Sequence, residues 1–139
     1  MPLPVYQNLD SIQRPSAGAT VLTAWGDAVN DDVTFLNGEA WVAPTLVNGW
    51  VNYGAGYAPA GYRRVGNVVR LRGFVTGGAA SSGLFTLPAG YRPAYPAVLV
   101  VDASGGFGAV VVGTTGAVVH NAGSVASFLD LDGLSFDLI

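Results

Sequence analysis

The sequence predicts a mainly β protein, in which a C-terminal β-sandwich or jelly-roll-like head follows a short N-terminal helix and an extended arm. From residue 45 onward, short segments of strand character recur about every 8–12 residues. Twenty glycines and eight prolines provide turns between them. Only residues 19–36 show a helical period. We therefore expect an arm over residues 1–17, a helical collar and linker over 18–40, and the β-head over 41–139.

The arm, residues 1–17, carries Pro2, Pro4 and Pro15 and has no hydrophobic period. Such a terminal segment is mobile unless it docks on another structure. Two interpretations stay open: a disordered leader, or an attachment peptide that orders on a larger assembly.

The predicted helix spans Ala19–Leu36, with Thr20 or Thr23 as the cap and Asn37-Gly38 as the stop. Its apolar stripe consists of Leu22, Trp25, Val29, Val33 and Leu36. A helix this short is marginal alone, so the stripe must pack on something. It packs either on copies of itself, as a short coiled-coil collar for oligomerisation, or on its own β-domain.

Alternating patterns and turn residues predict nine strands in the head. They are Thr45–Tyr53, Gly61–Val65, Asn67–Thr76, Gly83–Leu87, Ala97–Val101, Gly108–Val112, Ala117–His120, Ser127–Leu131 and Leu134–Leu138. Residues 77–83 are expected to form a flexible loop, and residues 102–106 and 113–116 to form hairpin turns.

The composition predicts an oligomer. Half of the residues are hydrophobic, only 11% are charged, and all six cations are arginines. So little charge leaves much apolar surface to be covered. Ala97–Val101 and Val110–Val112 are apolar without alternation, so we expect both faces of these strands to be covered, the second by another subunit.

Several classes of function are disfavoured. A net charge of −3 provides no general attraction to nucleic acid or to anionic membranes. Without cysteine there is no disulfide framework, thiolate nucleophile or zinc-thiolate site. No segment has the roughly 20 consecutive apolar residues of a membrane span. The N-terminus lacks the pattern of a secretory signal, so we expect synthesis in a host cytoplasm and no membrane insertion.

Catalysis is poorly supported, so we expect neither an enzyme nor a cofactor. No serine lies in a G-x-S-x-G context, and His120 is the only histidine. We interpret His120 as a hydrogen-bonded histidine at a strand end or interface, although symmetry could gather three copies round a metal. Asp130 and Asp132 precede Gly133, which indicates a tight Asp-Gly hairpin. Calcium needs about six or more oxygen ligands, and this turn supplies two carboxylates.

Arginines and aromatic residues gather in the middle of the chain. Five of the six arginines lie within residues 63–92. They can stack on sugars and grip carboxylates or phosphates, or they can form ion pairs between subunits, and both uses stay open. The candidate ligand-binding residues are Trp50, Tyr53, Tyr57, Tyr62, Arg63, Arg64, Tyr91 and Arg92.

Short motifs in this region resemble a module found near the C-terminal ends of tailed-phage tail-fibre, minor tail and receptor-binding proteins. The matching motifs are Asn48–Trp50, Tyr57–Pro59 followed by Tyr62-Arg63, Gly66–Val69 and Phe85–Pro93. Residues 19–29 are also similar to a segment that precedes fibre or spike domains in phage structural proteins.

The resemblance implies a homotrimeric virion structural protein, exposed on the virion surface. Its N-terminal arm would attach to other virion proteins, in the tail and baseplate or in the capsid. Its head would adhere to host-surface glycan. The alternative is a capsid decoration protein or head fibre with a stabilising or weakly adhesive role.

Overall fold

The computed structural model describes residues 37–123 and 128–139. The chain divides into two compact units, residues 1–37 and 38–139, and the second unit is the β-head. The expected arm and the expected helix, with its stripe from Leu22 to Leu36, lie outside the described residues. Within the described residues, no helix is long and apolar enough to cross a membrane.

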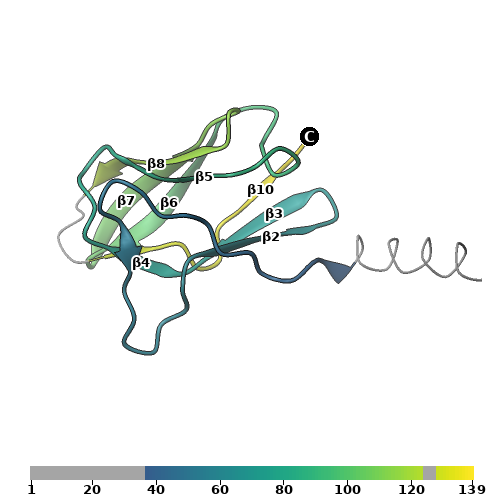
Figure 1. The fold of residues 1–139 in the computed structure, drawn as a ribbon. Helices are drawn as coiled ribbons and strands as arrows, with labels where there is room; N and C mark the ends of the chain where they lie inside the picture. The colour runs from purple at the N-terminus through teal and green to yellow at the C-terminus, as the bar shows by residue number, and fades with distance from the viewer. Residues whose placement is uncertain (1–36, 124–127) are drawn as a thin grey trace, which may run out of the picture. The chain divides into compact units, whose positions relative to one another are not determined.

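The head consists of two antiparallel sheets, as Figure 1 shows, which confirms the mainly β prediction. The first sheet has the order β1 (Val51–Asn52), β4 (Phe74–Thr76), β9 (Leu129–Asp130), β6 (Ala97–Ala103), β7 (Gly106–Val112), β8 (Ala117–Gly123) and β5 (Gly83–Thr86). The second has the order β10 (Ser135–Asp137), β3 (Val68–Arg72) and β2 (Gly61–Val65).

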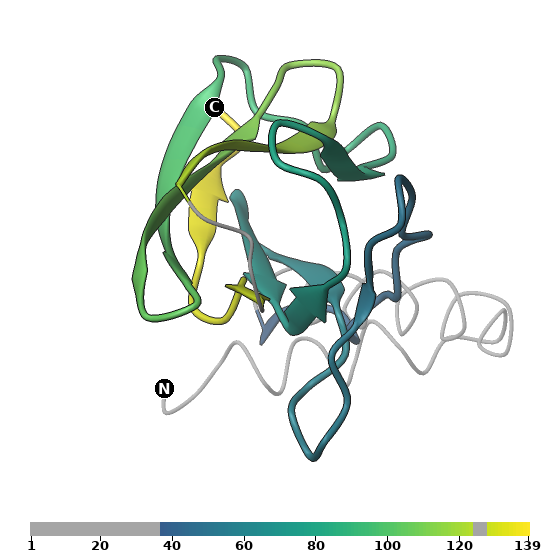
Figure 2. The ribbon, with the colours of Figure 1, turned by 90° about the vertical axis from the view of Figure 1, so that its left-hand side faces the viewer.

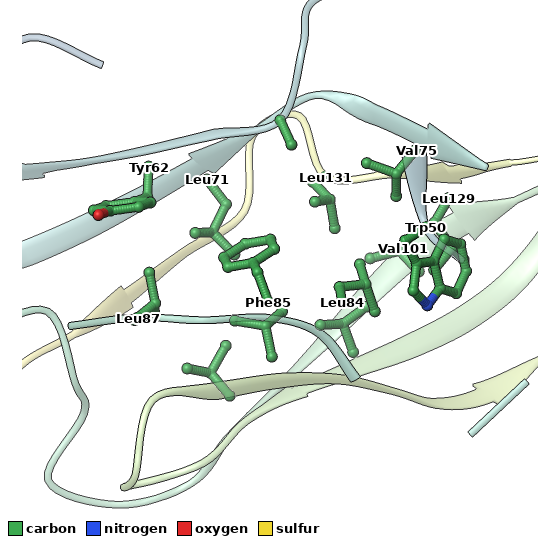
Figure 3. Close-up of a cluster of buried hydrophobic side chains, with 14 of the residues drawn as sticks. Trp50, Tyr62, Leu71, Val75, Leu84, Phe85, Leu87, Val101, Leu129 and Leu131 are labelled. Carbon is green, nitrogen blue, oxygen red and sulfur yellow. The ribbon is translucent and has the colours of Figure 1, made fainter. Parts of the chain in front are cut away.

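The two sheets curl around a shared hydrophobic core (Figures 1 and 2). Alternate residues face inward, as on β7, where Val110 and Val112 are fully buried and Val111 between them is not. Burial of one such aliphatic or aromatic side chain contributes roughly 1.5–3 kcal/mol. In Figure 3, side chains of β2, β3 and β4, among them Tyr62, Leu71 and Val75, lie across the core from Leu84 and Phe85 of β5 and from Leu87, which follows β5.

The expected strand Thr45–Tyr53 shrinks to the two residues of β1. Asn48 and Gly49 both have positive φ, 57° and 81°, and the Trp50 N–H donates to the Val47 carbonyl at 3.1 Å. This turn interrupts the extended backbone. The apolar residues on either side of it made the segment resemble one continuous strand in the sequence.

The expected turn at residues 102–106 is a two-residue hairpin loop between β6 and β7. Its central residues, Ser104 and Gly105, have φ values of 56° and 78°. Positive φ at both positions is the geometry that matches the twist of paired strands. The Asp102 carboxylate accepts a 3.0 Å hydrogen bond from the Gly105 N–H, and the strands run up to the turn, beyond the bounds the sequence suggested.

The expected strand Asn67–Thr76 breaks at Gly73, which was not predicted. Before Gly73 the chain lies in the three-stranded sheet as β3; after it the chain lies in the seven-stranded sheet as β4. Gly73 has φ +115°, and a Cβ placed on it would lie 2.5 Å from the Ala60 Cα. Only glycine fits this corner.

The segment that was expected to form an Asp-Gly hairpin does not join paired strands. Like Gly73, it lies where the chain passes from one sheet to the other. The turn after Asp130 connects β9 in one sheet with β10 in the other. The Asp130 carboxylate accepts the Asp132 N–H at 2.8 Å, and the Asp132 carboxylate accepts the Gly73 N–H at 2.8 Å. The two aspartates therefore hold the backbone of adjacent crossings.

The outer face of β6 and β7 is exposed in the single chain, and this is the face that we expect another subunit to cover. Val98 and Val100 are each 66% exposed, and Phe107 is 87% exposed. Cover by another subunit stays a prediction.

The loop at residues 77–83, which was expected to be flexible, is fixed to the core. The Trp50 indole N–H donates to the Ser82 hydroxyl at 2.8 Å, and the Ser81 N–H donates to His120 Nδ1 at 3.2 Å. A Cβ on Gly78 would overlap the Trp50 ring, so this loop lies flat on the indole. Glycine here serves close packing.

We expect Gly73→Ala to lower the free energy of unfolding far more than Gly90→Ala. Both glycines have positive φ, but only Gly73 has backbone where a Cβ would go, whereas nothing lies within 4 Å at Gly90. The left-handed backbone alone costs about 1–2 kcal/mol, and the clash at Gly73 should add at least about 2 kcal/mol. Urea unfolding of both variants tests this; equal losses would contradict the steric account of the corner.

Candidate ligand-binding surface

The eight candidate ligand-binding residues do not form one surface. Trp50 and Tyr62 belong to the core, with exposed fractions of 2% and 7%. Figure 3 shows both among the buried side chains. Their rings stabilise the head and offer no face to a ligand, so we leave them out of the candidate site.

Two of the arginines hold backbone. Arg64 donates from Nε to the Gly66 carbonyl at 2.7 Å and from Nη1 to the Gly90 carbonyl at 3.3 Å. Arg92 donates from Nε to the Leu87 carbonyl at 2.9 Å. These hydrogen bonds fix the turns between strands, so Arg64 and Arg92 stabilise the fold.

Tyr91 packs edge-on against Tyr62, with ring centroids 5.0 Å apart. A hydrogen bond with Glu39, followed by burial and the Glu39 charge, raises the pKa of Tyr91 to about 12. Burial, then the Glu39 charge, also raises the pKa of Tyr62. Glu39 additionally accepts the Arg64 backbone N–H at 3.2 Å, so this group anchors the start of the head to β2.

The other two candidate tyrosines, Tyr53 and Tyr57, form a surface cluster with two phenylalanines. Tyr57 stacks on Phe74 with centroids 4.3 Å apart and rings inclined at 24°, and Phe128 lies 5.0 Å from Phe74. Tyr53 contacts the other three edge-on at 5.6–6.1 Å. Tyr53 and Tyr57 are 41% and 51% exposed. We call these four residues the aromatic cluster.

The backbone holds the aromatic cluster in place. Residues 54–56 all have positive φ, between 52° and 86°, and they form the tip of the loop that projects from the head in Figures 1 and 2. The Tyr53 N–H donates to the Phe74 carbonyl at 2.9 Å, and the Phe74 N–H donates to the Ala58 carbonyl at 3.1 Å. The loop is thus tied to β4 on both sides of its tip, which pre-organises the rings.

Carboxylates lie beside the aromatic cluster on the outer face of the seven-stranded sheet. Asp130 is directly opposite Phe74, and Asp102 is directly opposite Asp130. Opposed residues in antiparallel strands share a face. Burial raises the pKa of Asp130, opposed by its bond from the Asp132 N–H and reinforced by the charges of Asp132 and Asp102. Aromatic rings provide apolar contact, and neighbouring carboxylates accept hydrogen bonds from hydroxyl groups.

Arg63 lies on another face. It shares the outer face of the three-stranded sheet with Arg70, directly opposite on β3. Its guanidinium carbon lies 4.9 Å from the centre of the Trp41 ring, and that of Arg72 lies 4.5 Å from the same ring. Trp41, which was not among the candidate ligand-binding residues, is the centre of this arrangement.

Comparison with known proteins finds one solved structure with a similar fold. No protein-family model and no curated protein sequence matches the chain. The structure is similar to the crystal structure of the receptor-binding protein (gp15) of Listeria phage PSA, with a TM-score of 0.63 and 20% sequence identity. The likeness covers 98% of this chain and 86% of that one. The head therefore has a fold found in a phage receptor-binding protein.

His120 lies inside the head, within β8, and not at a strand end as expected. Its side chain is 1% exposed, which leaves it out of reach of a second chain. Burial lowers the pKa of His120, against a smaller opposing effect of a backbone hydrogen bond at Ala122. Among the described residues, no group of three or more His, Asp or Glu side chains could hold a metal.

We expect the free energy of unfolding to fall as the pH drops below about 6.5, by at most about 1.4 kcal/mol per unit. The folded state lowers the pKa of His120, so the unfolded chain binds the proton more readily and protonation favours unfolding. His120 is the only histidine, so His120→Gln should remove this slope even if it lowers stability at every pH. Urea unfolding between about pH 8 and 5.5 measures it; an unchanged slope in the variant would contradict the assignment.

Proposed function

We propose that this protein is a structural component of a phage virion and that its head adheres to glycan on the host surface. The main support for this proposal is the aromatic cluster, whose four rings pack together at the surface beside two carboxylates. In this role Tyr53 and Tyr57 contact the apolar face of a sugar ring, and Asp102 and Asp130 accept its hydroxyl hydrogens. The similarity to a phage receptor-binding protein supports the same reading. The proposed activity is binding, with no catalytic step.

The proposed assembly is a homotrimer. Val98, Val100 and Phe107 project from the outer face of the seven-stranded sheet, and contact between copies would remove them from water. Phe107 is directly opposite Asp102, so the apolar patch adjoins the candidate site and a neighbouring chain can contribute to it. Three weak sites on one particle also bind a surface far more tightly than one site does.

The proposed attachment runs through the N-terminal arm, residues 1–17, to other virion proteins of the tail and baseplate or of the capsid. A capsid decoration protein or head fibre is the second candidate. It is favoured by the number of polar and aromatic side chains that hold the head together: Arg64, Arg92 and Trp50 all bind the protein's own loops. That leaves a small surface for a ligand, as a stabilising or weakly adhesive role requires.

We expect Tyr57→Ala to weaken binding of the purified protein to host cells by at least about tenfold, because it removes the most exposed ring of the aromatic cluster. Tyr95→Ala is the matched control, since Tyr95 is 80% exposed and has no ring contact with the cluster within the described residues. Both variants should keep the mass of three chains in light scattering. Unchanged cell binding by Tyr57→Ala, with Tyr95→Ala also unchanged, would rule out the cluster as the adhesive site.

Gold-labelled antibody on purified virions separates the two candidates. We expect label at the tail tip or baseplate, where host contact takes place. Label spread over the capsid would favour the decoration protein or head fibre, and virions without label would contradict both.

A further inference from the structure

Half of the chain's cations lie on one face of one small sheet. Arg63 on β2 is directly opposite Arg70 on β3, and Arg72 follows two residues later on the same face. Like charges directly opposite each other destabilise a sheet. In a chain with a net charge of −3, this concentration of positive charge calls for a physical explanation.

Trp41 orders the face. The backbone pairing of Val42 with Tyr62 places Trp41 beside Arg63, and the Arg63 and Arg72 guanidinium groups both lie within 5 Å of its ring centre. Gly61 leaves room for this arrangement, since a Cβ there would lie 3.2 Å from Arg72 Nε and 3.4 Å from the Trp41 ring. Two of the three cations are thus pre-positioned by one aromatic ring.

Asp137, opposite Val68 on β3, shares this face with the three arginines but forms no ion pair with them within the described residues. The Nε atoms of Arg63 and Arg72 are buried and have no hydrogen-bond partner, and within the described residues no carboxylate pairs with Arg63, Arg70 or Arg72. A buried N–H without a partner is costly, more so on a charged group. Arg64 and Arg92 show the contrast, because each donates its Nε–H to a backbone carbonyl.

We propose that this face is an oxyanion-binding site. The three arginines and Trp41 line a hollow of about 240 Å³, and Leu134 and Ser135 also line it. Planar guanidinium groups match the paired oxygens of phosphate or carboxylate, and the negative charge of such a group would offset the repulsion between the arginines. This inference rests on the proposed function: the ligand is a phosphate or carboxylate group carried by the host-surface polymer. The head then binds sugar at one sheet and negative charge at the other.

Nuclear magnetic resonance of the arginine Nε–Hε groups in the full chain tests this site. The probes are glycerol 1-phosphate and glucuronate, added separately at constant ionic strength. We expect saturable shifts of the Arg63 and Arg72 signals, while Arg64 and Arg92, already bonded to carbonyls, serve as internal controls. A response to only one probe identifies phosphate or carboxylate as the source. No shift with either probe, or equal shifts of all four signals, would overturn the proposal.

Arg70→Gln should weaken probe binding at least about tenfold, because it removes one charge-assisted donor and keeps a side chain of similar size. Arg92→Gln removes the same charge from a side chain that does not line the hollow, so it should leave binding unchanged. Equal weakening by both variants would show a general charge effect and contradict a built site. Because this experiment follows probe binding and not cell adhesion, its result is independent of whether the aromatic cluster binds glycan.

Discussion

The head depends on a corner where the chain has no room for a side chain. At Gly73 the backbone passes so close to Ala60 that a Cβ would overlap it. The Gly73 N–H donates to the Asp132 carboxylate, and its carbonyl accepts the Leu131 N–H at 2.8 Å. Here the chain leaves one sheet for the other, beside the return crossing after β9. Because Phe74 follows directly, the same corner sets the position of the aromatic cluster.

Periodicity predicted most of the strands and could not predict the corner. Val69 and Leu71 face inward before Gly73, and Val75 faces inward after it, so the alternation keeps its phase while the strand changes sheets. A two-residue alternation predicts which face of a sheet a residue lies on, but it does not predict which strand pairs with it. The hairpin at Ser104-Gly105 was easier, because its turn chemistry is local.

The candidate site was harder to predict, because it is assembled by register between distant segments. Because Arg63 and Arg64 are adjacent in sequence, they were placed in one candidate site. In the structure Arg63 lies against Trp41 on the outer face, whereas Arg64 donates to the Gly90 carbonyl. Neighbours on a strand lie on opposite faces. Phe74 and Phe128 meet only through the pairing of β4 with β9, so no local pattern could have shown that they belong with Tyr53 and Tyr57.

The projecting loop is braced by its main chain. Its bonds to β4 join the Tyr53 N–H to the Phe74 carbonyl and the Phe74 N–H to the Ala58 carbonyl, and none uses the tyrosine rings. The side chains at positions 53 and 57 can therefore be exchanged while the loop keeps its path. On the proposed function, the backbone of the loop and the surface that it presents can therefore evolve separately. Single substitutions at positions 53 and 57 would then change which host surface the head binds, while the fold of the head stays the same.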